Sequence, residues 1–259
     1  MGEATARIPD LPTVRRYEAG GFRAWPATRV VYDGTWVIRL TPGHPAKRLN
    51  SVNPLDPRDT GRLTERIAAA GRLFADTGKP LTFRLSPLSG DDLDRHLDRE
   101  GWSSFSESLV METAITDAQV ERATHRQPVR DIRQFMRAAA QVHGLDEEST
   151  QGMAGVIGSV KVNAGLFVLE RRGAPVTTLV CVQDGGIAGL FEVATSETER
   201  GKGHGHDLML SAIRWGGLAG ARTAWLQVEA DNRAAIELYR KMGFREAYRY
   251  HYRRPPEER

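Results

Sequence analysis

The clearest hydrophobic pattern lies in the C-terminal half, where three apolar or β-branched runs follow one another at short intervals. Arg172-Gly173 separates the first two runs, and Asp184-Gly185-Gly186 separates the second from the third. A glycine-containing turn between two apolar runs favours a β-hairpin. We therefore expect three antiparallel strands at 164–170, 175–183 and 187–195.

Beyond the third run the apolar period changes from that of a strand to that of a helix. Four apolar residues stand at i, i+1, i+4 and i+7: Leu208, Met209, Ala212 and Trp215. This spacing places them on one helix face. Gly216-Gly217 and Gly220 are expected to end the helix, because glycine is a poor helix former.

The last part of the chain reads as strand, helix, strand. A strand is expected at 224–229 and a helix at 233–242. Asn232 suits the N-cap of that helix and Gly243 its C′ position. Polar and apolar residues then alternate over 244–253, so that three tyrosines should share one side of a final strand: Tyr248, Tyr250 and Tyr252.

The first half reads as a weaker copy of this pattern. A strand at 81–85 precedes a helix at 91–100, then Gly101-Trp102, then an alternating strand at 103–113. Gly101-Trp102 aligns without a gap with Gly243-Phe244 of the second half. Upstream, 48–52 stands where the third strand of such a copy belongs, and a helix is expected at 60–77. We infer an internal repeat, with the polar stretch 116–130 as the boundary between its halves.

Composition and charge narrow the class of protein. Of the 259 residues, 40% are hydrophobic and 27% charged, which is typical of a soluble globular chain. No apolar run approaches the ~18 residues of a membrane span, and residues 1–10 lack the apolar core of a signal peptide. A single cysteine, Cys181, excludes a disulfide framework. A cytoplasmic protein without membrane contact is expected.

The charge balance argues against a nucleic-acid partner. The net charge is +3, from 36 basic and 33 acidic residues, and there is no polybasic block. A local basic pocket for an anionic small molecule is compatible with this balance.

A glycine-rich loop between a strand and a helix is the strongest chemical feature. It reads Arg200-Gly201-Lys202-Gly203-His204-Gly205. Backbone N–H groups at a helix N-terminus form a site for phosphate, and glycine lets the backbone approach a ligand closely. The loop does not fit GxxxxGK[ST] of a P-loop, and its GxGxG spacing does not fit the dinucleotide fingerprint.

The glycine-rich loop and the helix that begins after Asn232 resemble those of the GCN5-related N-acetyltransferases. Arg200–Gly205 matches the [QR]-x-x-G-x-[GA] motif of that family, and 228–244 resembles its "V…N..A..lY.k.GF" signature. The resemblance covers roughly 164–253. It implies an α+β fold with two mixed, mostly antiparallel sheets flanked by helices. We expect a degenerate domain at 1–118, which lacks the Gly-x-Gly loop, and a catalytic domain at 119–259.

The resemblance also implies a cosubstrate and its contacts. Acetyl-CoA would lay its diphosphate on the amides of Arg200–Gly205, and no metal is implied. Its pantetheine arm would pair with the backbone of Val193 and Thr195, as an added strand does. Asn232 would contact the pantetheine or the neighbouring strand.

Direct transfer to an amine needs a proton for the leaving thiolate. Tyr239 stands at the family's position for this donor; the alternative interpretation is a buried helix tyrosine bound to a backbone carbonyl. Glu192 is a candidate general base, or a strand carboxylate paired with an arginine. Glu229 is a candidate for binding the substrate amine, and the proton of the amine can also pass directly to water.

Other residues have plainer interpretations. His204 and His206 lack further ligands for a metal site, so His204 is expected to face solvent or the phosphates. Cys181, Trp25 and Trp36 are expected in the core. Two polar segments have two readings each: 48–52 lines an acceptor pocket or forms a satisfied polar patch, and 146–148 begins a helix or holds a cationic substrate.

The sequence thus predicts an N-acetyltransferase that uses acetyl-CoA and a small-molecule or protein amine, as a monomer or homodimer. A non-catalytic acyl-CoA-binding or regulatory module is the alternative. Peptidyl transfer from aminoacyl-tRNA, a third possibility, fits poorly because the loop at Arg200–Gly205 is intact.

Overall fold

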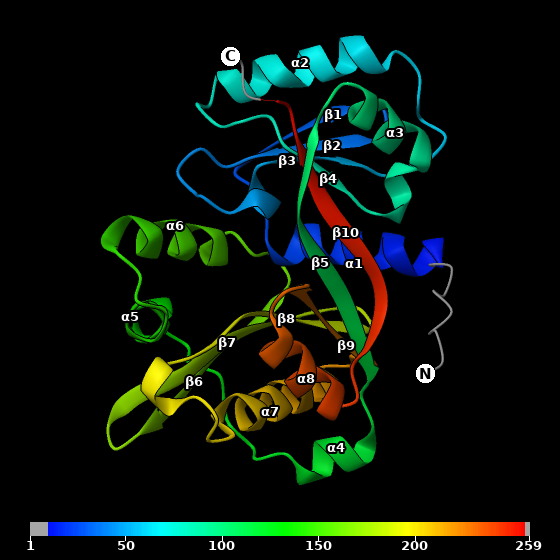
Figure 1. Cartoon of the computed structure of the whole chain (residues 1–259). Coiled ribbons are helices and arrows are strands. Elements are labelled where there is room, and N and C mark those ends of the chain that lie inside the picture. The colour runs from blue at the N-terminus through cyan, green and yellow to red at the C-terminus, as the bar shows by residue number, and fades with distance from the viewer. Residues whose placement is uncertain (1–9, 257–259) are drawn as a thin grey trace.

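A computed structural model describes residues 10–256, so most of the N-terminal segment weighed above as a signal peptide lies outside the described residues. Ten described strands form one sheet in the order β1-β2-β3-β4-β10-β5-β9-β8-β7-β6 (Figure 1). Their bounds are Arg29–Asp33 (β1), Trp36–Leu40 (β2), Ser51–Pro54 (β3), Phe83–Leu85 (β4), Ser103–Ala114 (β5), Asn163–Arg171 (β6), Ala174–Asp184 (β7), Ile187–Thr195 (β8), Thr223–Glu229 (β9) and Arg245–Arg254 (β10).

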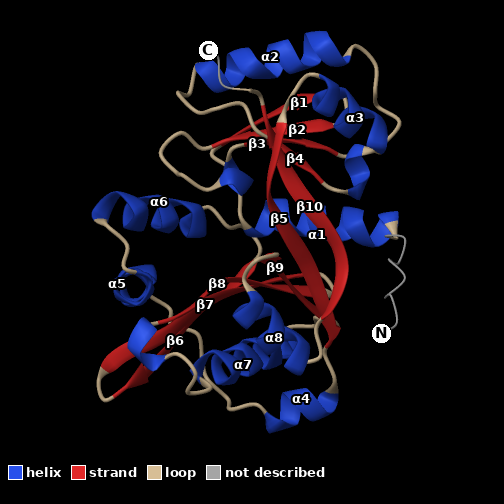
Figure 2. Ribbon diagram, viewed as in Figure 1, coloured by secondary structure: helices blue, strands red, loops and turns tan. Residues whose placement is uncertain are grey.

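Helices cover both faces of the sheet (Figure 2). The α-helices are Leu11–Ala24 (α1), Leu63–Ala75 (α2), Asp91–Arg99 (α3), Asp117–Arg122 (α4), Ile132–His143 (α5), Glu147–Gly158 (α6), His204–Leu218 (α7) and Arg233–Lys241 (α8). Residues of α1, α5 and α6 share one core cluster with β7 to β10. On the other face, α7 and α8 pack on the C-terminal strands, and α2 and α3 pack on β2 to β4.

The sheet is continuous because the two halves exchange their last strands. β5, from the first half, pairs with β9, whereas β10, from the second half, pairs with β4. β5 and β10 also pair antiparallel with each other and run side by side between the halves (Figure 1). The expectation of two separate sheets is therefore wrong: there is one mixed, mostly antiparallel sheet. The predicted division at residue 118 falls within α4 and stays a prediction.

The strand order is symmetric about the β5–β10 pair, as an internal repeat requires. Each half contains one parallel pair, β3 with β4 and β8 with β9. In each half a helix and a left-handed glycine follow that pair, Gly101 at φ 75° and Gly243 at φ 88°. Both glycines precede an exchanged strand, which agrees with the gapless alignment of the sequence.

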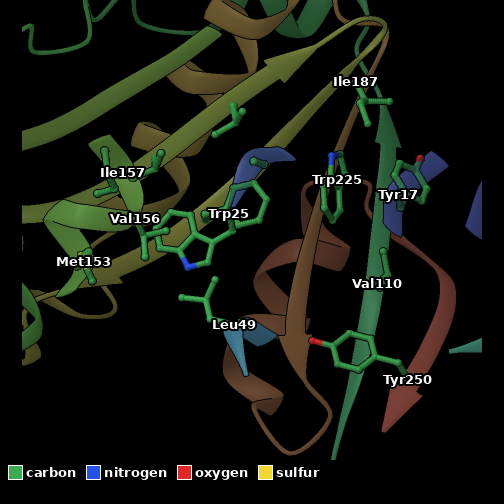
Figure 3. Close-up of a cluster of buried hydrophobic side chains, with 14 of the residues drawn as sticks. Tyr17, Trp25, Leu49, Val110, Met153, Val156, Ile157, Ile187, Trp225 and Tyr250 are labelled. Atoms are coloured by element: carbon green, nitrogen blue, oxygen red, sulfur yellow. The ribbon is translucent and has the colours of Figure 1, made fainter. Parts of the chain in front are cut away.

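The largest buried cluster lies where the two halves meet. Trp25, Trp225 and Tyr250 pack there with residues from α1, α6 and the central strands (Figure 3). Tyr248, Tyr250 and Tyr252 are all buried in this cluster, which confirms that they share one side of β10. The core positions of Trp25, Trp36 and Cys181 are also confirmed. Burial raises the pKa of the Cys181 thiol well above its usual range.

Two local predictions are wrong, one about the end of a helix and one about the position of a strand. Gly216 does not end a helix but lies inside α7, where a Cβ would stand 2.8 Å from the Ala188 Cβ. Glycine there lets α7 approach β8 closely. The strand predicted at 48–52 is displaced, because Lys47–Leu49 forms a 3₁₀ turn and β3 begins at Ser51.

The other boundaries are close to those predicted. β8 has the predicted bounds, and α2 is shorter at both ends than the predicted 60–77. Asn232 caps α8 as expected. Across residues 10–256, no helix combines the length and apolar character that crossing a membrane would demand.

Candidate functional site

The site begins where β8 and β9 separate. Their parallel pairing runs from Ile187 opposite Thr223 to Leu190 opposite Leu226 and continues no further. Beyond that point the strands border a cavity of about 210 Å³. It is lined by Arg48, Leu190, Phe191, Glu192, Val193, Leu226, Gln227, Val228, Glu229, Asn232 and Tyr239. We call this cavity the splay groove.

A β-bulge in β8 forms one wall of the splay groove. Glu192 has φ 49°, a left-handed conformation that non-glycine residues rarely adopt. The register with β7 shifts at the same place, between Thr178 and Val180. Bulges redirect side chains, and strained backbone of this kind gathers at functional sites. Here the bulge brings Glu192 to the groove, whose lining it shares with Phe191 and Val193.

Glu192 is held by a residue from the first half of the chain. Its Oε1 accepts a hydrogen bond from the Arg48 guanidinium in a half-buried ion pair. Arg48 also stacks on Trp25, at 4.8 Å from the ring centre. The second interpretation of Glu192, a strand carboxylate paired with an arginine, therefore describes its contact in the structure.

Tyr239 reaches the groove from α8. Its side chain lines the groove although the residue is only 7% exposed. Burial raises the pKa of its hydroxyl to about 12. Within residues 10–256 no hydrogen bond to a backbone carbonyl occupies this hydroxyl, which was the plainer of its two interpretations.

Asn232 stands where α8 begins. Its Oδ1 accepts a hydrogen bond from the Ala235 N–H at 3.1 Å, so the side chain is the N-cap. The same residue lines the splay groove. One side chain thus joins the helix start to the groove wall.

The glycine-rich loop presents a row of free backbone donors. Gly201 (φ 74°) and Gly203 (φ 82°) are left-handed, and α7 begins at His204. The first backbone donation at this helix start runs from the Asp207 N–H to the Gly203 carbonyl at 3.0 Å. In the described part of the chain the N–H groups of 201–206 have no acceptor. Such a row at the start of a 15-residue helix suits an anion.

The Glu199 carboxylate is hydrogen-bonded to two side chains of the loop, those of Lys202 and His204. Lys202 Nζ lies 2.9 Å from its Oε1, and His204 Nε2 lies 3.1 Å from its Oε2. The Lys202 hydrogen bond, followed by that of His204, lowers the pKa of Glu199. His204 therefore contacts a carboxylate, whereas solvent or phosphate was expected. Nearby, the Arg200 Nε donates to the Thr195 carbonyl at 3.3 Å.

Two further cavities adjoin these elements. One of about 600 Å³ lies between the β6–β7 turn and the loop, and Arg171, Arg172 and Lys202 are among its lining residues. The other, of about 200 Å³, shares four lining residues with the splay groove: Arg48, Gln227, Val228 and Glu229. We call it the acceptor cavity. Glu229 thus borders both the splay groove and the acceptor cavity, and its side chain is 59% exposed.

Some residues near the site escaped sequence reasoning. His143, at the end of α5, has Nε2 3.2 Å from Thr178 Oγ1. Burial lowers the pKa of His143, and the nearby Glu192 opposes this shift in part. Lys47, from the 3₁₀ turn before β3, lies 3.4 Å from Glu229. No motif marks either residue, because the tertiary fold alone brings them to β8 and β9.

The described residues contain no group of three or more His, Cys, Asp or Glu side chains arranged to hold a metal. The polar segment 146–148 begins α6, where Asp146 Oδ1 accepts from the Ser149 N–H at 2.8 Å. Asn50, in the other polar segment, binds the Thr41 N–H at 2.8 Å. In that segment the Asn50 side chain is thus hydrogen-bonded to the preceding loop, and Arg48 borders the cavities.

Comparisons with known proteins agree with this geometry. Residues 12–253 match the family described as "Probable histone acetyltransferase Rv0428c C-terminal". The "Uncharacterized N-acetyltransferase YobR" of Bacillus subtilis is 26% identical over 250 residues, which cover 94% of this chain and 99% of YobR.

Solved structures share the fold at low sequence identity. A GCN5-related N-acetyltransferase from Kribbella flavida has TM-score 0.70 at 18% identity and covers 94% of this chain and 95% of its own. A tandem GNAT protein from the clavulanic acid biosynthesis pathway has TM-score 0.62 at 15% identity and covers 100% of this chain and 92% of its own. The family match extends over almost the whole chain. The chain therefore belongs to the Rv0428c C-terminal family of GCN5-related N-acetyltransferases, a superfamily that uses an acyl-CoA as cosubstrate.

Proposed function

We propose that the protein transfers an acetyl group from acetyl-CoA to a primary amine. The observation that carries this proposal is the row of N–H groups at 201–206, which have no acceptor among the described residues and which follow β8, the strand that borders the groove opened by the separation of β8 and β9. Phosphate oxygens are acceptors that such a row can satisfy. The residues present therefore fit the diphosphate of the coenzyme.

The groove offers contacts for the rest of the coenzyme. Among the described residues β8 has no strand partner on the β9 side beyond Leu190, so an extended arm can pair with the backbone around Val193 and Thr195, whose carbonyl at Thr195 also accepts from Arg200 Nε. Asn232 and Tyr239 stand on the opposite wall. Bound there, the coenzyme supplies the acetyl group as a thioester.

The amine nitrogen forms the new C–N bond as the C–S bond breaks. The nitrogen loses one proton and the departing sulfur gains one. Tyr239 is the proposed donor of the latter proton, because burial raises its pKa to about 12 and keeps its hydroxyl protonated. Glu192, or water, receives the proton of the amine. The Arg48 contact holds the Glu192 carboxylate in the groove.

Binding of CoA to matched glycine variants tests the proposal. Gly203→Val places a β-branched residue at φ 82° in the loop, and Gly185→Val places one at φ 56° in the β7–β8 turn. Both positions favour glycine, so both variants should lose stability by a similar amount, about 1–2 kcal/mol. Only Gly203→Val should weaken CoA binding, by at least about tenfold, because only that change redirects the amides.

Isothermal titration calorimetry with CoA measures the affinities, and urea unfolding measures the stabilities. Equal CoA affinity in the two variants would remove the loop from the binding site. The alternative of a non-catalytic acyl-CoA-binding module predicts the same binding result but no amine acetylation, so CoA release with a panel of amines separates the two functions.

A further inference from the structure

The acceptor cavity is where an amine would approach the splay groove if the proposed function holds, and its walls carry both charge signs. It is lined by Ala46, Lys47, Arg48, Ser108, Gln227, Val228, Glu229, Tyr250 and Tyr252. Glu229 is the carboxylate that borders both spaces. Its place at the junction suits it to receive the ammonium form of an acceptor.

A protein cation already stands beside that carboxylate. Lys47 Nζ lies 3.4 Å from Glu229 Oε1 and 2.7 Å from Ser106 Oγ. The same ammonium lies over the rings of Tyr252 at 5.4 Å and Phe105 at 5.8 Å. These contacts keep the positive charge of Lys47 at the cavity. An acceptor with only positive charge would be repelled by Lys47 as it approached Glu229.

Three arginines near the acceptor cavity also carry positive charge. Arg84 pairs with Glu18, and Arg48 pairs with Glu192, but Arg39 has no ion pair among residues 10–256. Arg39 instead donates to the backbone carbonyls of Trp25 and Arg48. Burial, followed by the charges of Arg84 and Arg48, lowers the pKa of Arg39 to about 9.

Arg39, which has no ion-pair partner among residues 10–256, donates to the carbonyl of Arg48, a lining residue of the acceptor cavity. Arg39, Arg48, Arg84 and the carboxylate Glu18 line one small cavity, and Arg48 and Gln227 border both that cavity and the acceptor cavity. The surroundings of the cavity thus hold more positive than negative charge, which attracts an anionic group.

We propose that the acceptor is a small zwitterion, a primary amine that carries an acid group a few bonds away. Glu229 receives its ammonium, which loses one proton to water before the nitrogen attacks the thioester, and Lys47 binds its carboxylate or phosphate. The 3.4 Å separation of Lys47 from Glu229 fits closely spaced charges of opposite sign. The cavity volume of about 200 Å³ fits a small molecule of this kind. This inference rests on the proposed function and names the substrate class of its acceptor site.

Acceptors in matched pairs test the proposal on the full chain. β-Alanine and lysine are compared with the same molecules lacking the carboxylate, ethylamine and cadaverine, and 2-aminoethyl phosphate distinguishes phosphate from carboxylate. Spermidine and a lysine-rich peptide represent purely cationic acceptors. Thiol release from acetyl-CoA reports the rate. The acid-bearing member of each pair should have a kcat/KM at least about tenfold higher.

Variants at Lys47 separate binding of the acid group from a general defect. Lys47→Met should raise KM for the preferred zwitterion at least about tenfold, with little change for its partner without the acid. Lys47→Arg should retain most of the preference. Lys161→Met, at an exposed lysine outside the cavity, is the control and should behave as the original protein.

The possible failures are distinct. The zwitterion proposal is wrong, while acetyl transfer stands, if spermidine or the peptide has a higher kcat/KM than the zwitterions. The same holds if Lys47→Met accelerates acetylation of spermidine or the peptide and leaves the kinetics of the zwitterions unchanged. If CoA binds but no amine of any class is acetylated, the proposed function itself fails, and the acceptor proposal fails with it.

Discussion

Replacing Tyr239 with phenylalanine tests the proposed chemistry at a single atom. The ring stays where it is, because it packs against Phe244 with ring centres 6.0 Å apart. Tyr239 lines the splay groove, and burial raises the pKa of its hydroxyl to about 12. The change therefore removes a protonated donor from the groove and leaves the packing of α8 in place.

The two consequences differ greatly in size. A positioned general acid contributes about 10²–10⁴ in rate, so kcat of Tyr239→Phe should fall by that factor, or ~3–5 kcal/mol in activation free energy. The hydroxyl has no hydrogen-bond partner within residues 10–256. Its removal should therefore change the free energy of unfolding by less than about 1 kcal/mol and leave the Kd for CoA unaltered.

The raised pKa also has a pH signature. A free tyrosine titrates near pH 10, and Tyr239 in the folded protein has a pKa of about 12. The protonated hydroxyl contributes stability that is complete below about pH 10 and is lost as the pH rises through about 12. Tyr239→Phe lacks this contribution, so its stability should fall less steeply over the same alkaline range.

Thiol release with saturating acetyl-CoA and the best amine of a panel measures kcat. Calorimetry with CoA and urea unfolding provide the two quantities expected to stay constant. Tyr32→Phe, at a tyrosine that is 73% exposed on β1, is the matched control. A kcat of Tyr239→Phe within about threefold of the original would refute the role of the hydroxyl as proton donor.

Three further predictions concern the surroundings of the groove. Glu18→Ala leaves the buried Arg84 without its carboxylate, and urea unfolding should show a loss of about 3–5 kcal/mol; a loss below about 1 kcal/mol would contradict the buried pair. Glu192→Gln should lower kcat by at least about tenfold if Glu192 is the base, whereas an unchanged kcat with lower stability would leave it only its ion pair with Arg48. The folded-state pKa of His143 is lowered by burial, so the unfolded chain binds a proton first as the pH falls below about 6.5. Thermal stability should therefore decline from about pH 6.5 downward, and His143→Gln should make that decline shallower, as melting temperatures between pH 7 and pH 5 can show.

Local features were readable from the sequence because they depend on residues close along the chain. The strands β6, β7 and β8 follow from apolar runs separated by turn residues. The loop before α7 follows from glycines that relax backbone limits, and the cap of α8 follows from Asn232. The family match extends the resemblance seen over roughly 164–253 to residues 12–253.

The errors arose where a distant contact outweighs local preference. Gly216 reads as a helix stop, but the approach of Ala188 makes glycine the residue that fits within α7. Arg48, predicted within a strand at 48–52, lies instead in a 3₁₀ turn and pairs with Glu192, far away in the chain. In both cases the local pattern predicted one backbone structure, whereas the folded chain has another and contacts a distant residue there.

The sequence alone predicted the repeat, the glycine loop and most elements of the C-terminal half, but not α1, β1, β2 or α5, since periodicity and turn chemistry act over a few residues. The tertiary structure alone decided that the halves exchange β5 and β10 and form a single sheet. It also decided which charges meet, namely Arg48 with Glu192 and Lys47 with Glu229. Such pairs depend on strand order and the packing of both halves, and no spacing along one segment encodes them.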